Sequence, residues 1–386
     1  MSLRGQNCIF DRNRLSFRRN CSPIRHFLSK KYLSGEFERE RLWLKPRSFY
    51  ESHGVELKLG RRAIALDAAA QSVTLDDGAA LGYDQLLLAT GSRPRPLDAP
   101  GADLGGVHYL RSIADVDGIR AELGPGRRIV IVGAGYIGLE CAASCAKLGH
   151  DVTVLEMAER VMSRVVAPEM SAFYSEEHAA HGVKIHCDTM VAALEGDGRV
   201  REVVCRDGSR YPADLVIVGI GIVPNVELAR AAGIACDNGI AVDGHCRTSH
   251  AAVYAIGDCC SHPSPRYGRR IRLESVDNAF EQAKTAAANM CGRETVHDRV
   301  PWFWSDQYEL KLQIVGLAQG YDRVVLRGDP SGKAFSCCYL RGRELLAVDC
   351  VNQARDFMAG KKVIAERPAM DLDRLADPAI PLREAV

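Results

Sequence analysis

From about residue 55 onwards, apolar and polar positions alternate in short runs separated by turns that contain Gly and Asp. Three of these runs predict strands: Val55–Leu59, Ala63–Asp67 and Ser72–Leu75. The sequence Asp-Asp-Gly at 76–78 predicts a hairpin turn after the third run. A continuous apolar run at 85–90 stops at Gly91 and predicts a buried strand. The Pro- and Gly-rich stretch that follows, 94–106, predicts a crossing between domains.

The rest of the chain continues this mixture of strand and helix patterns. The apolar run Arg128–Val132 predicts a buried parallel strand, a helix rich in small residues follows, and Asp151–Leu155 predicts a second strand. A β-meander is expected at 183–218, and a strand, a Gly-Asp turn and a helix at 253–282. A β-rich block begins at residue 302, and helical turns follow it to the end. The order of elements predicts an α/β protein.

Composition narrows the class without naming a function. With 386 residues the chain is too long for a single core and is expected to form two or three domains. A hydrophobic content of 47% and a charged content of 26% are typical of a globular protein. The formal net charge of +1 favours neither a nucleic-acid partner nor an anionic membrane. No apolar run reaches the ~18 residues of a membrane span, so we expect a cytoplasmic protein without a membrane partner.

The 14 cysteines are scattered and form no Cys-x-x-Cys pair, which indicates reduced thiols in a cytoplasm. Four neighbouring residues have side chains that can ligate metals: His178, His181, His186 and Cys187. We interpret this stretch instead as an exposed helix end that runs into a strand at 183–186. No metal site is expected.

The first 27 residues are rich in arginine and contain one acid, Asp11. Such a composition is typical of transit peptides. No strand or helix periodicity is evident, however, and we favour an unstructured or wrongly translated start.

The most informative motif lies within Arg128–Glu156. Gly133, Gly135 and Gly138 form G-x-G-x-x-G between a strand and a helix, where glycines allow a tight turn, a close approach of a pyrophosphate and close helix packing. The free N–H groups at the helix start favour an anion. The acid at the end of the second strand, Glu156, suits a ribose 2′-hydroxyl and repels a 2′-phosphate. The motif therefore predicts NADH, although the nearby Arg160 weakens the preference over NADPH. As an alternative, Glu156 is only a solvated strand end.

Three further segments give a family resemblance. LLLATGSRP at 86–94 and VYAIGDC at 253–259 resemble the signatures of the flavoprotein pyridine-nucleotide oxidoreductases. RLESVDNAFEQA at 272–283 is similar to the segment that opens the helix beside the flavin ring in that family. The resemblance implies cofactor-binding residues for FAD and NADH beyond the glycine motif: Arg25, Thr90, Gly91, Gly221, Gly257, Asp258, Glu274, Ser275, Val276 and Trp304.

The C-terminal segments VPWFWSDQYELKLQIVG at 300–316 and VNQARDF at 351–357 are more specific. They resemble the NADH-dependent ferredoxin reductases that serve Rieske-type dioxygenases and bacterial cytochrome P-450 systems. By this resemblance Lys30 lies near the flavin and pairs with Glu140, which positions the nicotinamide, while Phe303 and Trp304 wall the flavin pocket. Read without the resemblance, Glu140 is an exposed helix carboxylate and the two aromatic residues are core.

Disulfide reductases of the same superfamily carry a redox-active Cys-x-x-x-x-Cys pair beside the flavin. Here the corresponding sequence is RHFLSK at 25–30, which leaves no cysteine pair. Cys141 and Cys145 lie one helical turn apart and are expected to pack in a core. Cys259 and Cys260 adjoin Asp258 but lack redox spacing, and the same interpretation holds for them.

The resemblance implies a chain with two Rossmann-like nucleotide-binding domains and a C-terminal α+β domain. We assign 1–110 and 229–299 to a discontinuous FAD domain, 111–228 to an NAD domain, and 300–386 to a C-terminal reductase domain. Electrons are expected to pass from NADH through FAD to a 2Fe–2S ferredoxin that feeds an oxygenase. The reductase is expected to be a monomer or a homodimer.

The family begins with its own strand, G-x-G-x-x-G loop and helix, whereas residues 1–24 contain a single glycine, Gly5. We therefore expect an altered or missing N-terminal βαβ unit, an uncovered sheet edge and weak FAD binding. Two alternatives to the reductase remain. One is a non-catalytic NADH-binding remnant that lacks FAD, and the other is an NADH peroxide or disulfide reductase, which the missing cysteine pair disfavours.

Overall fold

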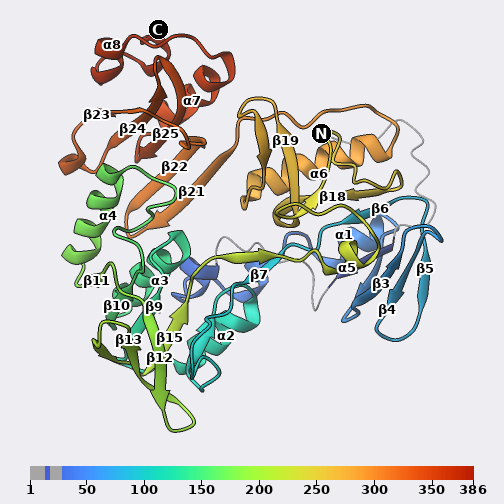
Figure 1. The fold of residues 1–386 in the computed structure, drawn as a ribbon, viewed down its shortest axis with the longest axis horizontal. Helices are drawn as coiled ribbons and strands as arrows, with labels where there is room; N and C mark the ends of the chain where they lie inside the picture. Colours follow the sequence, from blue (N-terminus) through green and yellow to red (C-terminus); the bar gives the residue numbers. More distant parts are fainter. Residues whose placement is uncertain (1–13, 18–27) are drawn as a thin grey trace. The chain divides into compact units, whose positions relative to one another are not determined.

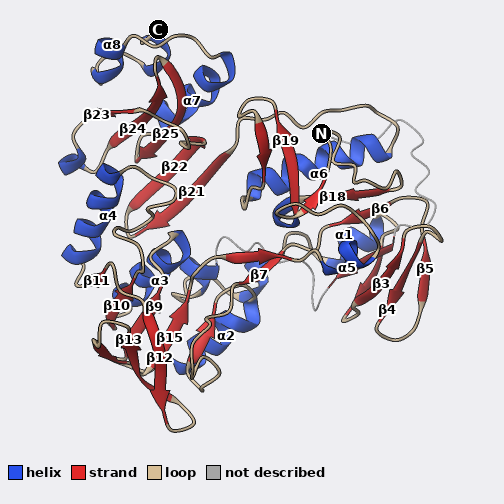
Figure 2. Cartoon of the chain, in the orientation of Figure 1, coloured by secondary structure: helices blue, strands red, loops and turns tan. Residues whose placement is uncertain are grey.

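A computed structural model describes residues 14–17 and 28–386 of the chain (Figure 1). The chain divides into two compact units. The first contains strand β1 (Arg14–Phe17), Arg39–Arg93 and Pro224–Arg299. The second contains Arg25–Glu38, Pro94–Val223 and Val300–Val386. Both units combine helices and strands (Figure 2), so the α/β class expected from the sequence is confirmed.

Strand β1 corrects one expectation. It pairs in parallel with β2 (Glu56–Leu59), in the register Arg14 with Glu56, so the N-terminal segment does supply a strand to a sheet. The segment Arg-Leu-Ser-Phe does alternate polar and apolar residues, but four residues are too few to stand out as a period. Strand formation depends on finding a partner, which the sequence of the segment alone does not reveal. The remaining expectations for 1–13 and 18–27 lie outside the described residues.

An antiparallel meander follows β2 in the first unit. Its strands are β3 (Ala63–Asp67), β4 (Ser72–Leu75) and β5 (Ala80–Gly82), and the first two have the predicted bounds. Strand β6 (Leu86–Leu88) pairs in parallel with β18 (Val253–Ala255). Apolar side chains of these strands share one core, which includes Leu66, Val73, Leu75, Leu88 and Val253.

The other elements of the first unit are short, except for one long helix. The strands are β17 (Ile240–Ala241), β19 (Cys260–Ser264) and β20 (Arg269–Ile271), of which the sequence predicted none. The helices are η3 (Arg39–Leu42), α1 (Arg47–Ser52), α5 (Glu227–Ala231), η4 (Gly257–Cys259) and the long α6 (Val276–Met290). Strands β7 (Ser92–Pro94) and β16 (Ile222–Pro224), where the chain passes from one unit to the other, pair with each other.

A five-stranded parallel sheet is the centre of the second unit. Its order is β11 (Lys184–His186), β10 (Asp151–Leu155), β9 (Arg128–Val132), β15 (Leu215–Val218) and β8 (Val107–Tyr109). Helices α2 (Ile113–Glu122), α3 (Tyr136–Lys147) and α4 (Pro168–Ala180) belong to the same unit, and so does the short turn η2 (Leu28–Tyr32). Strands β9 and β10 have the predicted bounds.

The predicted meander at 183–218 is therefore only partly right. Strands β12 (Val191–Gly196), β13 (Val200–Cys205) and β14 (Arg210–Pro212) form an antiparallel sheet, but β11 and β15 join the parallel one. All four residues of β15 are apolar and buried. A continuous apolar run is typical of a central parallel strand, because helices cover both faces of such a sheet.

The end of the second unit is an antiparallel sheet covered by a helix. Its order is β21 (Trp302–Gln307), β22 (Leu310–Gly316), β25 (Glu344–Val351), β24 (Phe335–Arg341) and β23 (Arg323–Arg327). Helices η5 (Pro330–Gly332), α7 (Ala354–Glu366), α8 (Leu372–Ala376) and η6 (Leu382–Glu384) complete it, and Phe357 and Ile364 of α7 lie in its core.

The interpretation of the stretch around His178 as an exposed helix end is wrong for His178 and right for residues 179–182, which are exposed. His178 is buried, and its ring nitrogens lie 2.8 Å from the Gln307 side-chain oxygen and 3.0 Å from the Tyr308 hydroxyl. His181 stacks on the Tyr308 ring at 3.7 Å. His178 is covered because this part of α4 packs against the β21–β22 turn, which is distant in sequence. Within residues 14–17 and 28–386, no group of three or more His, Cys, Asp or Glu side chains is arranged to hold a metal ion. Likewise, no helix of this part of the chain is long and apolar enough to cross a membrane.

Candidate active site

The glycine motif forms a tight connection between β9 and α3. A Cβ atom on Gly138 would lie 1.9 Å from the Gly133 carbonyl oxygen, and one on Gly133 would lie 2.6 Å from the Gly219 oxygen, so neither position accepts a side chain. Gly135 is the N-cap of α3, no side chain caps the helix there, and the space beside Gly135 is open. The start of α3 therefore presents uncapped N–H groups to that space. This arrangement fits a dinucleotide pyrophosphate.

Glu156 follows β10 and faces the same loop. Its carboxylate accepts hydrogen bonds from the Ala134 N–H at 2.6 Å and the Ala158 N–H at 2.9 Å, so it is not merely a solvated strand end. Each oxygen retains a lone pair that can accept a ribose hydroxyl. The guanidinium of Arg160 donates to the carbonyl of Val166 at 2.8 Å and to the hydroxyl of Ser171 at 2.7 Å. Arg160 is thus held at the start of α4.

Glu140, on α3, is the centre of a buried ionic cluster. Its carboxylate lies 3.1 Å from the Lys30 ammonium, so the ion pair implied by the family resemblance is present. The hydroxyls of Ser29 and Ser305 donate to the two carboxylate oxygens at 2.5 and 2.6 Å. The Glu140 side chain is 3% exposed, and this burial raises the pKa of its carboxyl, against the opposing effects of the Lys30 cation and the two hydroxyl donors. Glu140 is therefore not an exposed helix carboxylate.

Sequence reasoning missed the residues around this pair. Besides Ser29 and Ser305, Asp306 lies 3.5 Å from the Lys30 ammonium, which therefore bridges two carboxylates. Ser144, one turn after Glu140 on α3, donates to the Ser29 carbonyl at 2.8 Å. Their positions in the sequence could have indicated these two serines, because Ser29 directly precedes Lys30 and Ser305 lies in the family-specific segment that begins at Val300.

The aromatic residues of β21 are only partly buried. The Phe303 ring lies 4.8 Å from the ring of Tyr136, the first residue of α3, and is therefore close to the glycine motif. The Trp304 ring stacks on Trp302 at 5.3 Å. Trp302 packs on the C-terminal core, and Trp304 is half-buried, as Trp302 is.

Most of the other predicted site residues lie in the first unit. Thr90 and Gly91 follow β6, and Gly257 and Asp258 follow its parallel partner β18, so they meet at one sheet edge. The Asp258 carboxylate accepts a hydrogen bond from Ser92 Oγ at 3.1 Å. Open α/β sheets bind ligands at the carboxyl ends of their strands. This edge fits the ribityl part of FAD. A pyrophosphate cradle ahead of residue 25 falls outside the described residues.

The segment before α6 is ordered by its own polar contacts. Glu274 pairs with Arg272 at 2.7 Å, and the Ser275 hydroxyl caps α6 by accepting the Asn278 N–H at 3.1 Å. Val276 is the first residue of α6 and is exposed. Gly221 lies between β15 and β16 of the second unit. Arg25 lies outside the described residues.

The cysteine pairs are suited to packing. Cys141 and Cys145 are buried on α3, and burial raises the pKa of Cys145 to about 12. Burial also raises the pKa of Cys259 and that of Cys260. Thiolates are the reactive form of cysteine, so burial works against reactivity at these positions. The described cysteines are all free thiols, and the expectation of core packing is confirmed for these four.

Comparison with known proteins agrees with this geometry. The family profile described as pyridine nucleotide-disulphide oxidoreductase matches residues 5–287, and the profile described as reductase C-terminal matches residues 302–386. The chain is 46% identical to the 5,5'-dehydrodivanillate O-demethylase ferredoxin reductase subunit of Sphingobium sp., over 92% of this chain and 87% of that protein. It is 44% identical to putidaredoxin reductase of Pseudomonas putida, over 93% of this chain and 86% of that protein.

A solved structure gives the same result in three dimensions. The crystal structure of the covalent putidaredoxin reductase–putidaredoxin complex matches with a TM-score of 0.93 and 43% identity, over 96% of this chain and 91% of that chain. The glycine motif, the parallel sheet around it and the C-terminal sheet all lie within the residues that the two family profiles match. The chain belongs to the pyridine nucleotide-disulphide oxidoreductase family and ends in a reductase C-terminal domain.

Proposed function

We propose that the protein is an FAD-dependent NADH:ferredoxin oxidoreductase that supplies electrons to an oxygenase through a 2Fe–2S ferredoxin. The observation that carries the proposal is the buried ion pair between Lys30 of η2 and Glu140, which lies on the helix that begins at the glycine motif. It occupies the region where disulfide reductases of the superfamily keep their redox cysteines. The names of the relatives, which include a demethylase ferredoxin reductase subunit and putidaredoxin reductase, support the same activity.

Two sets of residues would hold the cofactors. NADH would lie on the loop of Gly133, Gly135 and Gly138, with its adenosine ribose at Glu156. FAD would be held by the carboxyl edge of β6 and β18, with Asp258, and by the segment that opens α6. When bound, FAD can accept a hydride from NADH and release the electrons one at a time. We accordingly propose the FAD domain at 1–110 and 229–299, the NAD domain at 111–228 and the reductase domain at 300–386.

The ionic cluster would position the nicotinamide. Lys30 is fixed between Glu140 and Asp306, and Glu140 is fixed by the hydroxyls of Ser29 and Ser305. A side chain with this many partners keeps its orientation at little further cost in entropy when a ligand binds. The buried carboxylate also keeps a negative charge beside the ammonium, which stabilises the cation in a largely dry site.

Glu156 supports NADH as the electron donor. A 2′-phosphate on the adenosine ribose would meet this carboxylate at close range. Arg160, the nearby cation, directs its guanidinium donors to the Val166 carbonyl and the Ser171 hydroxyl.

The free thiols support a reducing compartment, and we place the enzyme in the cytoplasm as a monomer or homodimer. The buried cysteines provide no dithiol route for the electrons, which supports a one-electron acceptor such as a ferredoxin. A peroxide or disulfide reductase needs a reactive thiol, and Cys141, Cys145, Cys259 and Cys260 are all buried.

The test is NADH oxidation by the purified, FAD-supplemented chain with three alternative acceptors: a 2Fe–2S ferredoxin, hydrogen peroxide and a small disulfide. We expect turnover with the ferredoxin, followed by the loss of its visible absorption, and little with the other two. Rapid turnover with peroxide or disulfide in the absence of ferredoxin would favour the second enzyme class. A protein that binds NADH but takes up no FAD would be the non-catalytic remnant.

A further inference from the structure

Gln282 of α6 is fully buried and bonded at both ends of its side-chain amide. Its oxygen accepts the Gly257 backbone N–H at 2.7 Å, the Asn278 side-chain N–H at 3.2 Å and the Cys260 thiol at 3.3 Å. Its nitrogen lies 3.0 Å from His262 Nδ1. One side chain therefore joins α6 to the Gly257–Asp258 turn and to β19.

The orientation of the amide follows from chemistry. A backbone N–H can only donate, so the atom that faces Gly257 must be the amide oxygen. The amide nitrogen then points to His262 Nδ1, which must be unprotonated to accept from it. Burial lowers the pKa of His262 to about 4, which agrees with a neutral ring. The bond from Gly257 thus determines both the amide orientation and the histidine tautomer.

The turn held by Gln282 contains Asp258, the acid assigned to FAD. Gly257 has a φ of +74°, a conformation that favours glycine, and its N–H would be unpaired without the Gln282 oxygen. Asp258 is further held by Ser92 Oγ, and its carbonyl accepts from Arg272 at 3.3 Å. We propose that Gln282 is a positioning residue, which sets the Gly257–Asp258 turn in the conformation that binds FAD. This inference rests on the proposed function.

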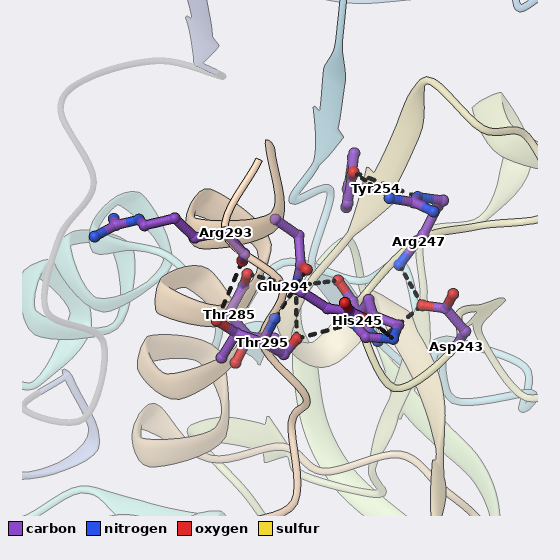
Figure 3. A network of polar contacts seen from close by, with 9 residues as sticks. Asp243, His245, Arg247, Tyr254, Thr285, Arg293, Glu294 and Thr295 are labelled. Carbon is purple, nitrogen blue, oxygen red and sulfur yellow. Dashed lines mark hydrogen bonds and ion pairs between the residues drawn. The ribbon is translucent and has the colours of Figure 1, made fainter. Parts of the chain in front are cut away.

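A second buried amide on the same helix serves as the control. Asn289, close to the end of α6, donates to the Thr295 carbonyl at 2.7 Å and accepts the Thr295 N–H at 3.1 Å. Figure 3 shows the polar network on that side, in which Thr285, Thr295 and His245 come together. Within the described part of the chain, the Asn289 side chain bonds to the carbonyls of His245, Thr285 and Thr295 and to the Thr295 N–H, and not to Gly257, Asp258 or Gln282. Replacing Asn289 therefore tests the effect of a less stable α6 helix without removing a contact to the Gly257–Asp258 turn.

The experiment compares Gln282→Met with Asn289→Leu in the full chain, each substitution keeping the approximate size of the side chain. FAD is titrated into protein stripped of flavin, and the quenching of flavin fluorescence gives Kd. We expect Kd to rise at least ~10-fold in Gln282→Met, because leaving the buried Gly257 N–H unpaired corresponds to about a factor of ten or more in an equilibrium constant. In Asn289→Leu we expect Kd to stay within ~3-fold of wild type. Hydrogen exchange of the Gly257 amide, measured without FAD, should accelerate in Gln282→Met and not in Asn289→Leu.

A third variant tests the orientation. In Gln282→Glu the carboxylate still accepts from Gly257, but its second oxygen needs a donor, so the His262 proton should move to Nδ1. Nitrogen NMR of the imidazole detects this change. An unchanged Kd in Gln282→Met overturns the inference and leaves the proposed function standing. A wild-type chain that takes up no FAD overturns the proposed function. In that event the inference is decided by the two measurements that need no FAD. Gly257 exchange that is unchanged in Gln282→Met, or a wild-type His262 that is protonated at Nδ1, overturns the inference as well. Faster Gly257 exchange in Gln282→Met, together with a wild-type His262 unprotonated at Nδ1, supports Gln282 as the residue that holds the turn.

Discussion

Replacing Lys30 by Met is the sharpest test of the ionic cluster. Methionine has a similar length and no charge, so the change removes the cation and leaves most of the packing. Among the described residues, Glu140 would then keep the hydroxyls of Ser29 and Ser305 as its donors. Its side chain is 3% exposed and that of Lys30 is 11% exposed, so water does not replace the lost partner. Breaking a buried pair in this way destabilises a protein by about 3–5 kcal/mol.

The loss should depend on pH in a definite direction. Removing Lys30 raises the folded-state pKa of Glu140 further above its ordinary value of 4.5. The unfolded chain keeps the ordinary value. The destabilisation relative to wild type is therefore fully present above the folded-state pKa of the variant. It fades as the pH falls through the folded-state pKa of the wild type, below which the carboxyl is protonated in both folded proteins.

The assay is chemical denaturation of four proteins at pH 8 and pH 5: wild type, Lys30→Met, Glu140→Gln and the double variant. The double variant should recover most of the stability, because no unpaired charge remains. Stopped-flow reduction of bound flavin by NADH should be slower in Lys30→Met by at least ~10-fold, as positioning is lost. A loss below ~1 kcal/mol that is equal at both pH values, together with unchanged flavin reduction, would refute the reasoning.

Further outcomes concern specificity, electron flow, a second buried acid and cofactor content. We expect NADH to exceed NADPH by at least ~10-fold in kcat/KM, measured side by side, because Glu156 repels the 2′-phosphate. Changing Cys141 and Cys145 to Ala should leave ferredoxin or ferricyanide turnover within a few-fold, and a collapse would show that these thiols carry electrons. Burial raises the pKa of Asp349 to about 7, so its charge destabilises the fold increasingly as pH rises from 3.8 to 7. In denaturation curves Asp349→Asn should therefore be more stable than wild type by about 4 kcal/mol at pH 8.5 and by about 2 kcal/mol at pH 5; an equal gain at both would contradict this. The purified chain should contain less than one FAD per protein by absorbance, because residues 1–24 include a single glycine and so lack a G-x-G-x-x-G loop for the FAD pyrophosphate. Full occupancy would show that another element binds the pyrophosphate.

Local patterns were sufficient for much of the fold and for the nucleotide loop. The strands β3, β4, β9 and β10 have the bounds that their apolar runs predicted. The glycine motif was equally readable, because a tight strand-to-helix turn depends on residues that are adjacent in sequence. Family resemblance added the pair of Lys30 and Glu140, which no local pattern links across 110 positions.

Tertiary structure decided everything that depends on which elements pack together. Strand β1 forms because β2 lies beside it, and β15 joins the parallel sheet because β8 and β9 flank it. The hydroxyls of Ser29 and Ser305 reach Glu140 from positions 111 and 165 residues away. Sequence determined which groups are able to bind or ionise. Only packing decided which of them are buried, and the pairing of a group follows from burial, because a polar group removed from water must find a partner in the fold.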